Sequence, residues 1–215
     1  ADVYCFSTYI WNIEYIKAIS ERLKKATNAI IILGGPEAGG DAEGFIKKNP
    51  YCDYVIKGEG ELALENLLKA IEKGETPDFP GVYHKNGGCG TAPGLKEFIP
   101  YYTDENIKEN FGKILYYETS RGCFNKCAYC ISGKEEVHLY DEEKIKKDIR
   151  HIVSFDIPLI KLVDRSFNAY GKRSERMLRF LSEETGNTSF HLEVAPDLFS
   201  EEMLDIIKSA KKGKF

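Results

Sequence analysis

The sequence has no long hydrophobic run, no marked excess of charge and only one tryptophan among its 215 residues. Its longest apolar run, residues 29–33, falls far short of the roughly 20 residues that a membrane-spanning helix needs, so we expect no membrane partner. Thirty Lys and Arg against 34 Asp and Glu give a formal net charge of −4, which argues against a nucleic-acid partner. No basic-then-apolar leader opens the sequence, and we expect a cytoplasmic protein in a reducing compartment.

The six cysteines lack the paired spacing of a disulfide framework. Three are isolated and three fall within eight residues: the isolated ones are Cys5, Cys52 and Cys89, and the grouped ones are Cys123, Cys127 and Cys130. Such uneven spacing is typical of a reducing compartment and of a metal site. The sequence therefore predicts a metal centre rather than disulfide bonds.

What the sequence does have is an alternation of strand-like and helix-like segments. Residues 3–8, 29–33 and 53–57 have the character of strands, and each precedes a segment with helical spacing of apolar residues. The first of these helices is predicted to begin at Asn12, as its N-cap. A run that is apolar on both faces, such as residues 29–33, suits a parallel sheet covered by helices. Residues 1–75 are therefore predicted to form part of a doubly wound, Rossmann-like α/β domain.

Residues 76–113 interrupt this alternation with several prolines and glycines. Residues 81–85, followed by Asn86 and Gly87, are typical of one arm of a hairpin. We interpret this stretch as a connector that carries a small hairpin.

A second series of strands and helices occupies residues 114–215. Its predicted strands cover residues 114–119, 159–163 and 189–194, and a helix follows each of them. Three strand–helix units make an unfinished sheet or barrel, and the sequence begins with Ala1 rather than Met, two residues before a predicted strand. We therefore expect an internal fragment of a longer protein, inactive by itself.

The grouped cysteines follow the first strand of this second series, with the spacing C-x3-C-x2-C. A four-iron cluster normally takes one protein thiolate per iron, so three local thiolates leave one iron open for a ligand. A catalytic metal site keeps an open position in the same way. A zinc site with His138 or a distant cysteine as fourth ligand is the alternative, although zinc sites usually have paired C-x2-C elements and only one is present.

The cysteine segment resembles the signature of the radical S-adenosylmethionine (SAM) enzymes. The resemblance implies that Cys123, Cys127 and Cys130 hold a [4Fe-4S] cluster, with SAM bound at the open iron. It implies that Tyr129, directly before the last cysteine, lies against the adenine of SAM. It also implies that residues 114–215 are the first half of a partial (βα)6 barrel.

Polar residues follow the two later strands of the second series. Asp164 and Asn168 follow residues 159–163, and Glu193 lies near the end of the last predicted strand. In radical SAM enzymes polar residues at these places hold the amino, carboxylate and ribose groups of SAM, so the resemblance makes these three residues SAM-binding candidates. A helix cap, a loop turn and a paired strand carboxylate are their respective structural alternatives.

The first half lacks the dinucleotide fingerprint G-x-G-x-x-G. Its segment 7–9, separated by 24 intervening residues from the double glycine, instead resembles the S-x-L and G-G part of cobalamin-binding domains. Residues 53–61 resemble the end of such domains. The resemblance implies a cobalamin site formed by Ser7, Tyr9, Gly34, Gly35, Gly58, Glu59 and Gly60. Glycines that only form turns are the alternative. The D-x-H-x-x-G loop of such domains does not occur upstream in this sequence.

Taken together, the resemblance implies a radical SAM enzyme of the cobalamin-binding subgroup, similar to the anaerobic magnesium-protoporphyrin IX monomethyl ester oxidative cyclases. Such an enzyme works under anaerobic or reducing conditions on a small-molecule substrate, with an external electron donor such as flavodoxin or ferredoxin. The expected reaction is oxidative cyclisation of a tetrapyrrole side chain, and methyl or methylthio transfer is the alternative. A zinc-stapled binding module is the alternative that is not an enzyme.

Overall fold

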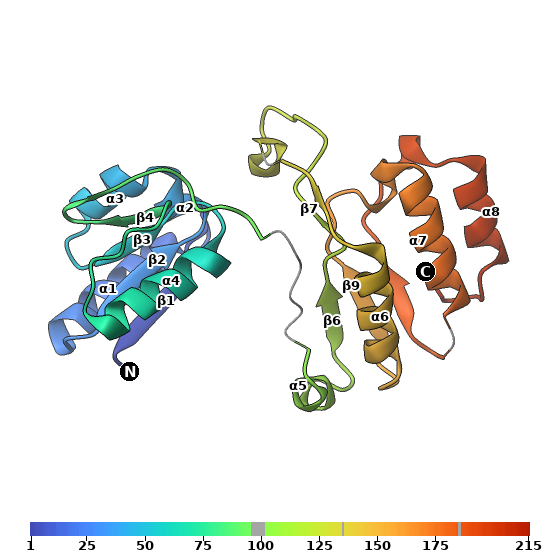
Figure 1. The fold of residues 1–215 in the computed structure, drawn as a ribbon, viewed down its shortest axis with the longest axis horizontal. Helices are drawn as coiled ribbons and strands as arrows, with labels where there is room; N and C mark the ends of the chain where they lie inside the picture. Colours follow the sequence, from blue (N-terminus) through green and yellow to red (C-terminus); the bar gives the residue numbers. More distant parts are fainter. Residues whose placement is uncertain (96–101, 135, 185) are drawn as a thin grey trace. The chain divides into compact units, whose positions relative to one another are not determined.

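A computed structural model describes residues 1–95, 102–134, 136–184 and 186–215. The chain divides into two compact units, Ala1–Leu95 and Lys96–Phe215, which we treat separately (Figure 1). Part of the predicted connector, residues 96–101, lies outside the described residues.

A five-stranded sheet in the order β1-β2-β3-β4-β5 forms the centre of the first unit. The strands are β1 (Val3–Ser7), β2 (Ile30–Gly34), β3 (Tyr54–Ile56), β4 (Val82–His84) and β5 (Gly87–Gly88). The first three strands are parallel, and β4 and β5 are added as an antiparallel hairpin. The helices are α1 (Ile13–Ala26), α2 (Pro36–Gly40), α3 (Ala42–Lys48) and α4 (Gly60–Lys73).

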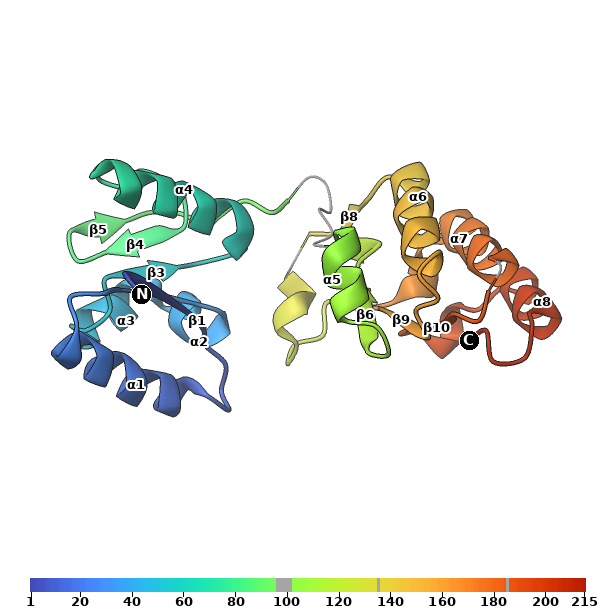
Figure 2. The same cartoon turned by 90° about the horizontal axis from the view of Figure 1, so that it is seen from below.

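Successive residues of β2 point to opposite faces of this sheet, as the strand period of two requires. Ile31 and Leu33 pack in one cluster with Ile16 of α1, whereas Ile32, between them, packs with Leu67 of α4. Helices therefore cover both faces of the sheet (Figure 2). The predicted doubly wound α/β arrangement is confirmed.

Three local features differ from the expectation. The predicted hairpin is present, but β4 pairs with β3 in the register Tyr54↔His84, so it completes the first sheet and the first unit extends to residue 95 rather than 75. The short helix α2 follows the double glycine directly, where no helix was expected. Asn12 stands at the N-cap position of α1, but its side chain is used within the preceding loop: it accepts a hydrogen bond from the Tyr9 amide at 2.7 Å and donates to the Ser7 carbonyl at 3.0 Å.

The second unit contains a parallel three-stranded sheet in the order β10-β9-β6. Its strands are β6 (Ile114–Tyr117), β9 (Leu159–Leu162) and β10 (Ser189–His191), and its main helices are α6 (Glu142–Val153), α7 (Lys172–Glu183) and α8 (Glu201–Ser209). An additional helix, α5 (Asp104–Glu109), precedes β6 and was not expected. The order of strands and helices otherwise follows the sequence prediction, with strands two or three residues shorter at some ends.

One apolar stripe of α6 forms much of the second core. Ile145, Ile149 and Ile152 are buried together with Ile160 and Leu162 of β9. Their spacing of three and four residues places them on one face of the helix. No helix in the described ranges is both long and apolar enough to span a membrane.

Replacement of Ile149 by alanine tests this core. The side chain is completely buried, so Ile149→Ala should lower the free energy of unfolding by about 2–4 kcal/mol. Lys147→Ala, at an exposed position of the same helix, should change it by less than about 0.5 kcal/mol. Chemical denaturation followed by circular dichroism measures both, and equal effects would contradict the assigned packing of α6.

Candidate functional site

The cysteine loop is closed at its base by a short two-stranded ribbon. Strand β7 (Ser120–Arg121) pairs antiparallel with β8 (His138–Leu139), in the register Ser120↔Leu139 and Arg121↔His138. The loop between them contains the 3₁₀ helix η1 (Ile131–Lys134), and residue 135 is outside the described ranges. The ribbon follows β6, so the cysteines extend beyond the carboxyl end of a parallel strand (Figure 1), where α/β folds place their sites.

All three grouped cysteines are free thiols that a metal centre can reach. Cys123 is half-buried, whereas Cys127 and Cys130 are exposed, and the Cys130 amide donates to the Cys127 carbonyl at 3.1 Å. The neighbouring Tyr129 is 92% exposed. Within the described residues, no three metal-ligating side chains already converge on one point. The donors therefore fit an iron–sulfur cluster by number, chemical type and accessibility.

Gly122 is required where the loop begins. Its φ angle is +86°, and a Cβ atom at this position would lie 2.3 Å from the Glu136 carbonyl oxygen. Only glycine allows such a close approach of the two chain segments. The sequence motif contains this glycine directly before Cys123, but the sequence analysis did not assign it a role.

The carboxylate of Asp164 binds the chain segment that leads into the cysteine loop. Asp164 is 1% exposed, and its Oδ1 accepts hydrogen bonds from the Thr119 hydroxyl at 2.6 Å and the Ser120 hydroxyl at 2.5 Å. Its Oδ2 accepts from the Thr119 amide at 3.2 Å. Burial raises the pKa of Asp164, and these hydrogen bonds partly oppose the shift. The structure thus gives the carboxylate partners within the chain, and its contact with SAM stays a prediction.

Arg173 is a site residue that the sequence analysis missed. Its Nη2 atom donates to the Thr119 carbonyl at 3.0 Å and to the Tyr140 carbonyl at 2.9 Å. The Tyr140 amide also donates to the Thr119 carbonyl, at 3.2 Å. The Arg173 side chain is 11% exposed, and burial lowers its pKa. Nothing in the local sequence could have indicated this role, because both partners are distant along the chain.

Tyr170 is a second residue beside the cysteine loop that the sequence did not indicate. It ends the 3₁₀ helix η2 (Phe167–Tyr170). Burial raises the pKa of Tyr170, a hydrogen bond with Ser120 opposes this shift, and the negative charge of Asp164 raises the pKa further. The phenol therefore contacts β7, the strand that leads into the cysteine loop.

Asn168 and Glu193 follow the two neighbouring strands at the same edge of the sheet. Asn168 is 3% exposed; its amide donates to the Ala195 carbonyl at 2.8 Å and accepts from the Ala195 amide at 2.9 Å. Glu193 lies two residues beyond β10, is exposed, and pairs with Lys161 at 3.1 Å. Both thus have partners in the chain, and Glu193 is the more accessible of the two.

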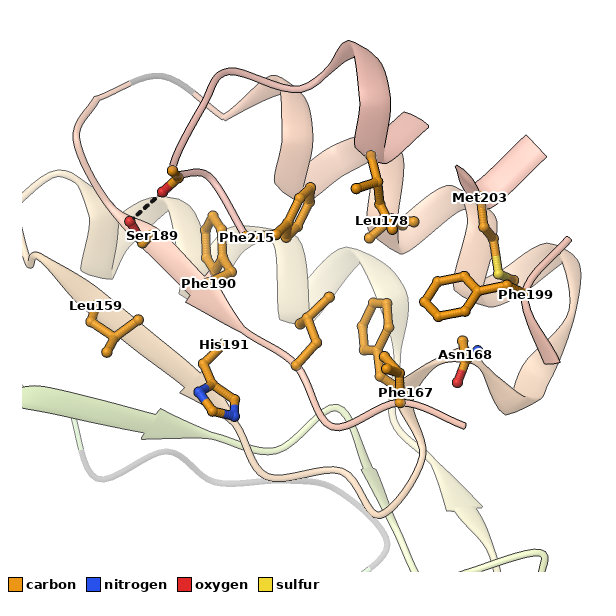
Figure 3. Close-up of a pocket in the computed structure, with 14 residues that line it drawn as sticks. Leu159, Phe167, Asn168, Leu178, Ser189, Phe190, His191, Phe199, Met203 and Phe215 are labelled. Carbon is orange, nitrogen blue, oxygen red and sulfur yellow. Dashed lines mark hydrogen bonds between the residues drawn. The ribbon is translucent and has the colours of Figure 1, made fainter. Parts of the chain in front are cut away.

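A largely apolar cavity of about 430 Å³ lies beside β10 (Figure 3). Its walls include Phe190, Phe199 and Met203, and Asn168 is among the few polar groups that line it. The last residues of the chain run along the outer side of β10, where the Phe190 amide donates to the Lys214 carbonyl at 2.7 Å. None of the described residues of the cysteine loop lines this cavity.

In the first unit, the double glycine Gly34–Gly35 packs against Thr8, which follows the end of β1. The buried Thr8 hydroxyl donates to the Gly34 carbonyl at 2.6 Å and accepts from the Ala38 amide at 2.9 Å. Gly35 has a φ angle of +87°, and a Cβ atom there would lie 2.5 Å from the Thr8 carbonyl oxygen. Gly35 is therefore needed for contact within the chain. The sequence analysis named the residues on both sides of Thr8 but not Thr8 itself.

Gly58 and Glu59 likewise contact the chain. Gly58 has a φ angle of +98°, and a Cβ atom there would approach Thr91 to 2.6 Å. Glu59 accepts a hydrogen bond from the Leu95 amide at 3.3 Å, whereas a Cβ atom at Gly60 would meet no described atom within 4 Å. The turn interpretation thus accounts for Gly58, and cobalamin contacts at all three residues stay predictions.

The loop between β1 and α1 presents exposed apolar side chains at the same edge of the sheet. Tyr9 and Trp11 stack with ring centroids 4.7 Å apart and planes within 5°. Ile10 and Trp11 are 78% and 72% exposed. Ser7, the other candidate in this strand end, is also exposed. The exposed side chains of Ile10 and Trp11 thus extend the apolar surface beyond Tyr9, the residue that the sequence indicates.

The chain is similar in sequence to a known protein family and to known enzymes. The B12 binding domain family matches residues 1–68. The cobalamin-dependent radical SAM methyltransferase TokK of Streptomyces tokunonensis is 24% identical over 188 residues, which make up 77% of this chain and 28% of that protein. The 2-(S-pantetheinyl)-carbapenam-3-carboxylate methyltransferase of Streptantibioticus cattleyicolor is 25% identical over 189 residues, with the same two coverages.

Two further proteins extend the comparison. The anaerobic magnesium-protoporphyrin IX monomethyl ester cyclase of Cereibacter sphaeroides is 25% identical over 145 residues, or 59% of this chain and 24% of that protein. The radical SAM methyltransferase TsrM of Kitasatospora setae shares the fold with a TM-score of 0.71 and 16% identity, over 96% of this chain and 46% of TsrM. TsrM has also been solved with cobalamin and a [4Fe-4S] cluster bound.

The chain therefore spans between 24% and 46% of the length of these proteins. The match to the B12 binding domain covers residues 1–68 of the first unit, and the fold shared with TsrM extends over 96% of the chain. The chain thus contains a match to the B12 binding domain family and is similar to cobalamin-dependent radical SAM methyltransferases over 77% of its length.

Proposed function

We propose that this chain provides the cobalamin-binding and cluster-binding parts of a radical SAM methyltransferase. The observation that carries the proposal is the closed loop with three accessible free thiols at the carboxyl end of β6. It occurs in a chain whose first 68 residues match the B12 binding domain family. Cobalamin in the first unit and an iron–sulfur cluster in the second are the two cofactors that such a methyltransferase needs.

Cys123, Cys127 and Cys130 would hold the [4Fe-4S] cluster, which when bound supplies the electron for reductive cleavage of SAM. The protein's own part is to fix the three thiols and to bind SAM beside them. The exposed ring of Tyr129 offers a flat surface for the adenine, and the accessible carboxylate of Glu193 offers an acceptor for a hydroxyl or amino group. We assign Asn168 and Asp164 a supporting role, because their side chains already hold neighbouring strand ends.

The cobalamin site would lie at the carboxyl edge of the first sheet. Tyr9, Ile10 and Trp11 give it an exposed apolar wall, and the backbone at residues 34–35 and 58–60 forms the turns after the next two strands. Parallel α/β sheets bind their ligands at this edge. We include Ser7 as a polar contact because it is exposed at the end of β1.

Methyl transfer fits the comparisons better than the oxidative cyclisation expected first. TokK and the carbapenam-carboxylate methyltransferase each match 77% of the chain, whereas the cyclase matches 59%. We therefore propose transfer of a methyl group to a small organic molecule, with cobalamin as methyl carrier and an external electron donor such as flavodoxin or ferredoxin. Cyclisation of a tetrapyrrole is the less supported reaction.

The cluster assignment can be tested on the isolated chain. After anaerobic reconstitution with iron and sulfide, we expect about four irons per chain and the brown colour of a [4Fe-4S] cluster. Alanine at Cys123, Cys127 or Cys130 should each remove more than about half of the iron, because the chain supplies three ligands and a cluster held by two is easily lost as a whole. Iron analysis and visible absorption measure this.

Cys89→Ala is the matched control, because Cys89 is also an exposed free cysteine but lies far from the loop in sequence. It should bind iron like the unmodified chain. A colourless protein that holds one zinc would contradict the proposal and support the zinc-stapled module, in which His138 of β8 would be a ligand.

The cobalamin assignment can be followed through Trp11, the single tryptophan of the chain. Hydroxocobalamin should quench its fluorescence in a saturable manner, beyond the quenching of free N-acetyltryptophanamide. Gly35→Ala should weaken the binding about tenfold, because a side chain at a φ angle of +87° costs roughly 1–2 kcal/mol and would collide with Thr8. Gly40→Ala is the control, since a Cβ atom there meets no described atom within 4 Å. Quenching that never saturates would exclude a cobalamin site beside Trp11.

A further inference from the structure

We propose that Arg173 and Asp164 are positioning residues that lock the base of the cysteine loop, so that its two ends stay together when the three thiols bind one cluster. The proposal deepens the cluster assignment and rests on it for its functional consequence. The lock itself is a property of the chain and can be tested without any cofactor.

The two ends of the loop meet at one point. The chain leaves the second sheet through Thr119 and returns through Tyr140, and the Tyr140 amide donates to the Thr119 carbonyl at 3.2 Å. A single nitrogen of Arg173 donates to the carbonyl groups of both residues, at 3.0 and 2.9 Å. Arg173 therefore fixes the distance between the outgoing and the returning segment.

Asp164 holds the outgoing segment from the neighbouring strand. Its carboxylate accepts three hydrogen bonds, two from Thr119 and one from Ser120. Arg173 donates a hydrogen bond to the carbonyl group of Thr119, whereas Asp164 accepts hydrogen bonds from the amide and the hydroxyl group of the same residue. Thr119 is 1% exposed, so its backbone and side-chain polar groups are satisfied by this pair of opposite charges. Hydrogen bonds to charged groups are stronger than neutral ones.

Burial of the Arg173 guanidinium is unfavourable unless hydrogen-bond acceptors are placed to receive it. A guanidinium loses its hydration when it is buried, and only well-placed acceptors compensate. Here the carbonyl groups of Thr119 and Tyr140 are the close acceptors, and the Glu142 carboxylate is farther away at 4.0 Å. The acceptors thus belong to the base of the cysteine loop, and the hydrogen bonds to them compensate for the lost hydration of the guanidinium.

Arg176 provides a natural control on the same helix. It pairs with the same carboxylate, Glu142, at 2.5 Å, but its side chain is 56% exposed and the structure gives it no bond to Thr119 or Tyr140 among the described contacts. A change at Arg176 alters the charge of α7 without touching the loop base. Any effect found at Arg173 and not at Arg176 is therefore due to the lock.

Trypsin cleavage after Lys126 measures the lock in the cofactor-free chain, because Lys126 is exposed in the middle of the cysteine loop. Arg173→Met should speed this cleavage about tenfold, because loss of a charge-assisted hydrogen bond raises the population of the locally opened loop by about that factor. Arg173→Lys should have an intermediate rate, because an ammonium keeps the charge. Arg176→Met should cleave within about twofold of the unmodified chain.

The consequence for the cluster is measured separately, after anaerobic reconstitution. Arg173→Met and Asp164→Asn should lose iron to a ferrous chelator about tenfold faster than Arg176→Met, because outer residues that orient metal ligands change affinity by roughly 10–100-fold. The electron paramagnetic resonance spectrum of the reduced cluster should also broaden in Arg173→Met. A residue with a merely structural role would leave that spectrum unchanged.

Equal cleavage rates for Arg173→Met and Arg176→Met, at unchanged circular dichroism, would overturn the proposal. If Arg173→Met does not fold, Arg173→Lys decides in its place, and cleavage at the unmodified rate would overturn it as well. A chain that shows the expected cleavage pattern but binds no iron would refute the proposed function and leave the lock in place. The two failures are thus distinguishable.

Discussion

Parallel strand pairing is the constraint on which both units depend. Consecutive parallel strands need a crossover that returns the chain to its starting edge, and each crossover here contains a helix. The carboxyl ends of β1, β2 and β3 therefore share one edge of the first sheet, and those of β6, β9 and β10 share one edge of the second. Every candidate residue for cofactor binding lies at such a strand end or in the loop after it.

Most polar groups at these two edges bind the chain itself. Thr8 binds the loop after β2, Asp164 binds the segment after β6, and Asn168 binds the segment after β10. Each of these bonds connects the end of one strand to the loop of a neighbour, which holds the edge in a single shape. Among the described candidate residues, those that stay accessible are Cys127, Cys130, Tyr129, Glu193, Ser7 and the aromatic loop around Trp11. A rigid edge with a few accessible groups lowers the ordering cost of binding a ligand.

The sequence predicts those features whose determinants are close together along the chain. The isoleucines of α6 and the C-x3-C-x2-C spacing could be recognised for this reason, whereas the five residues of α2 and the six of α5 contain too few turns for a periodic signal. The partner of β4 is a tertiary contact and has no local signature. Likewise Asp164 finds its partner Thr119 at a separation of 45 residues, and Arg173 finds the same residue at a separation of 54. Residue type and strand position indicated that Asp164 matters, but not whether it binds a ligand or the chain.

Arg173 and Arg176 show how little residue type determines the role of a side chain on α7. Helical spacing of three places both near Glu142, yet one points into the protein and the other to solvent. The buried one joins the two ends of the cysteine loop. Ordering a loop costs conformational entropy. A loop whose ends are already joined has fewer conformations, so it loses less entropy when its side chains bind a common ligand. The burial of one guanidinium, unfavourable for stability by itself, therefore becomes favourable once the loop has to hold three thiols around one centre.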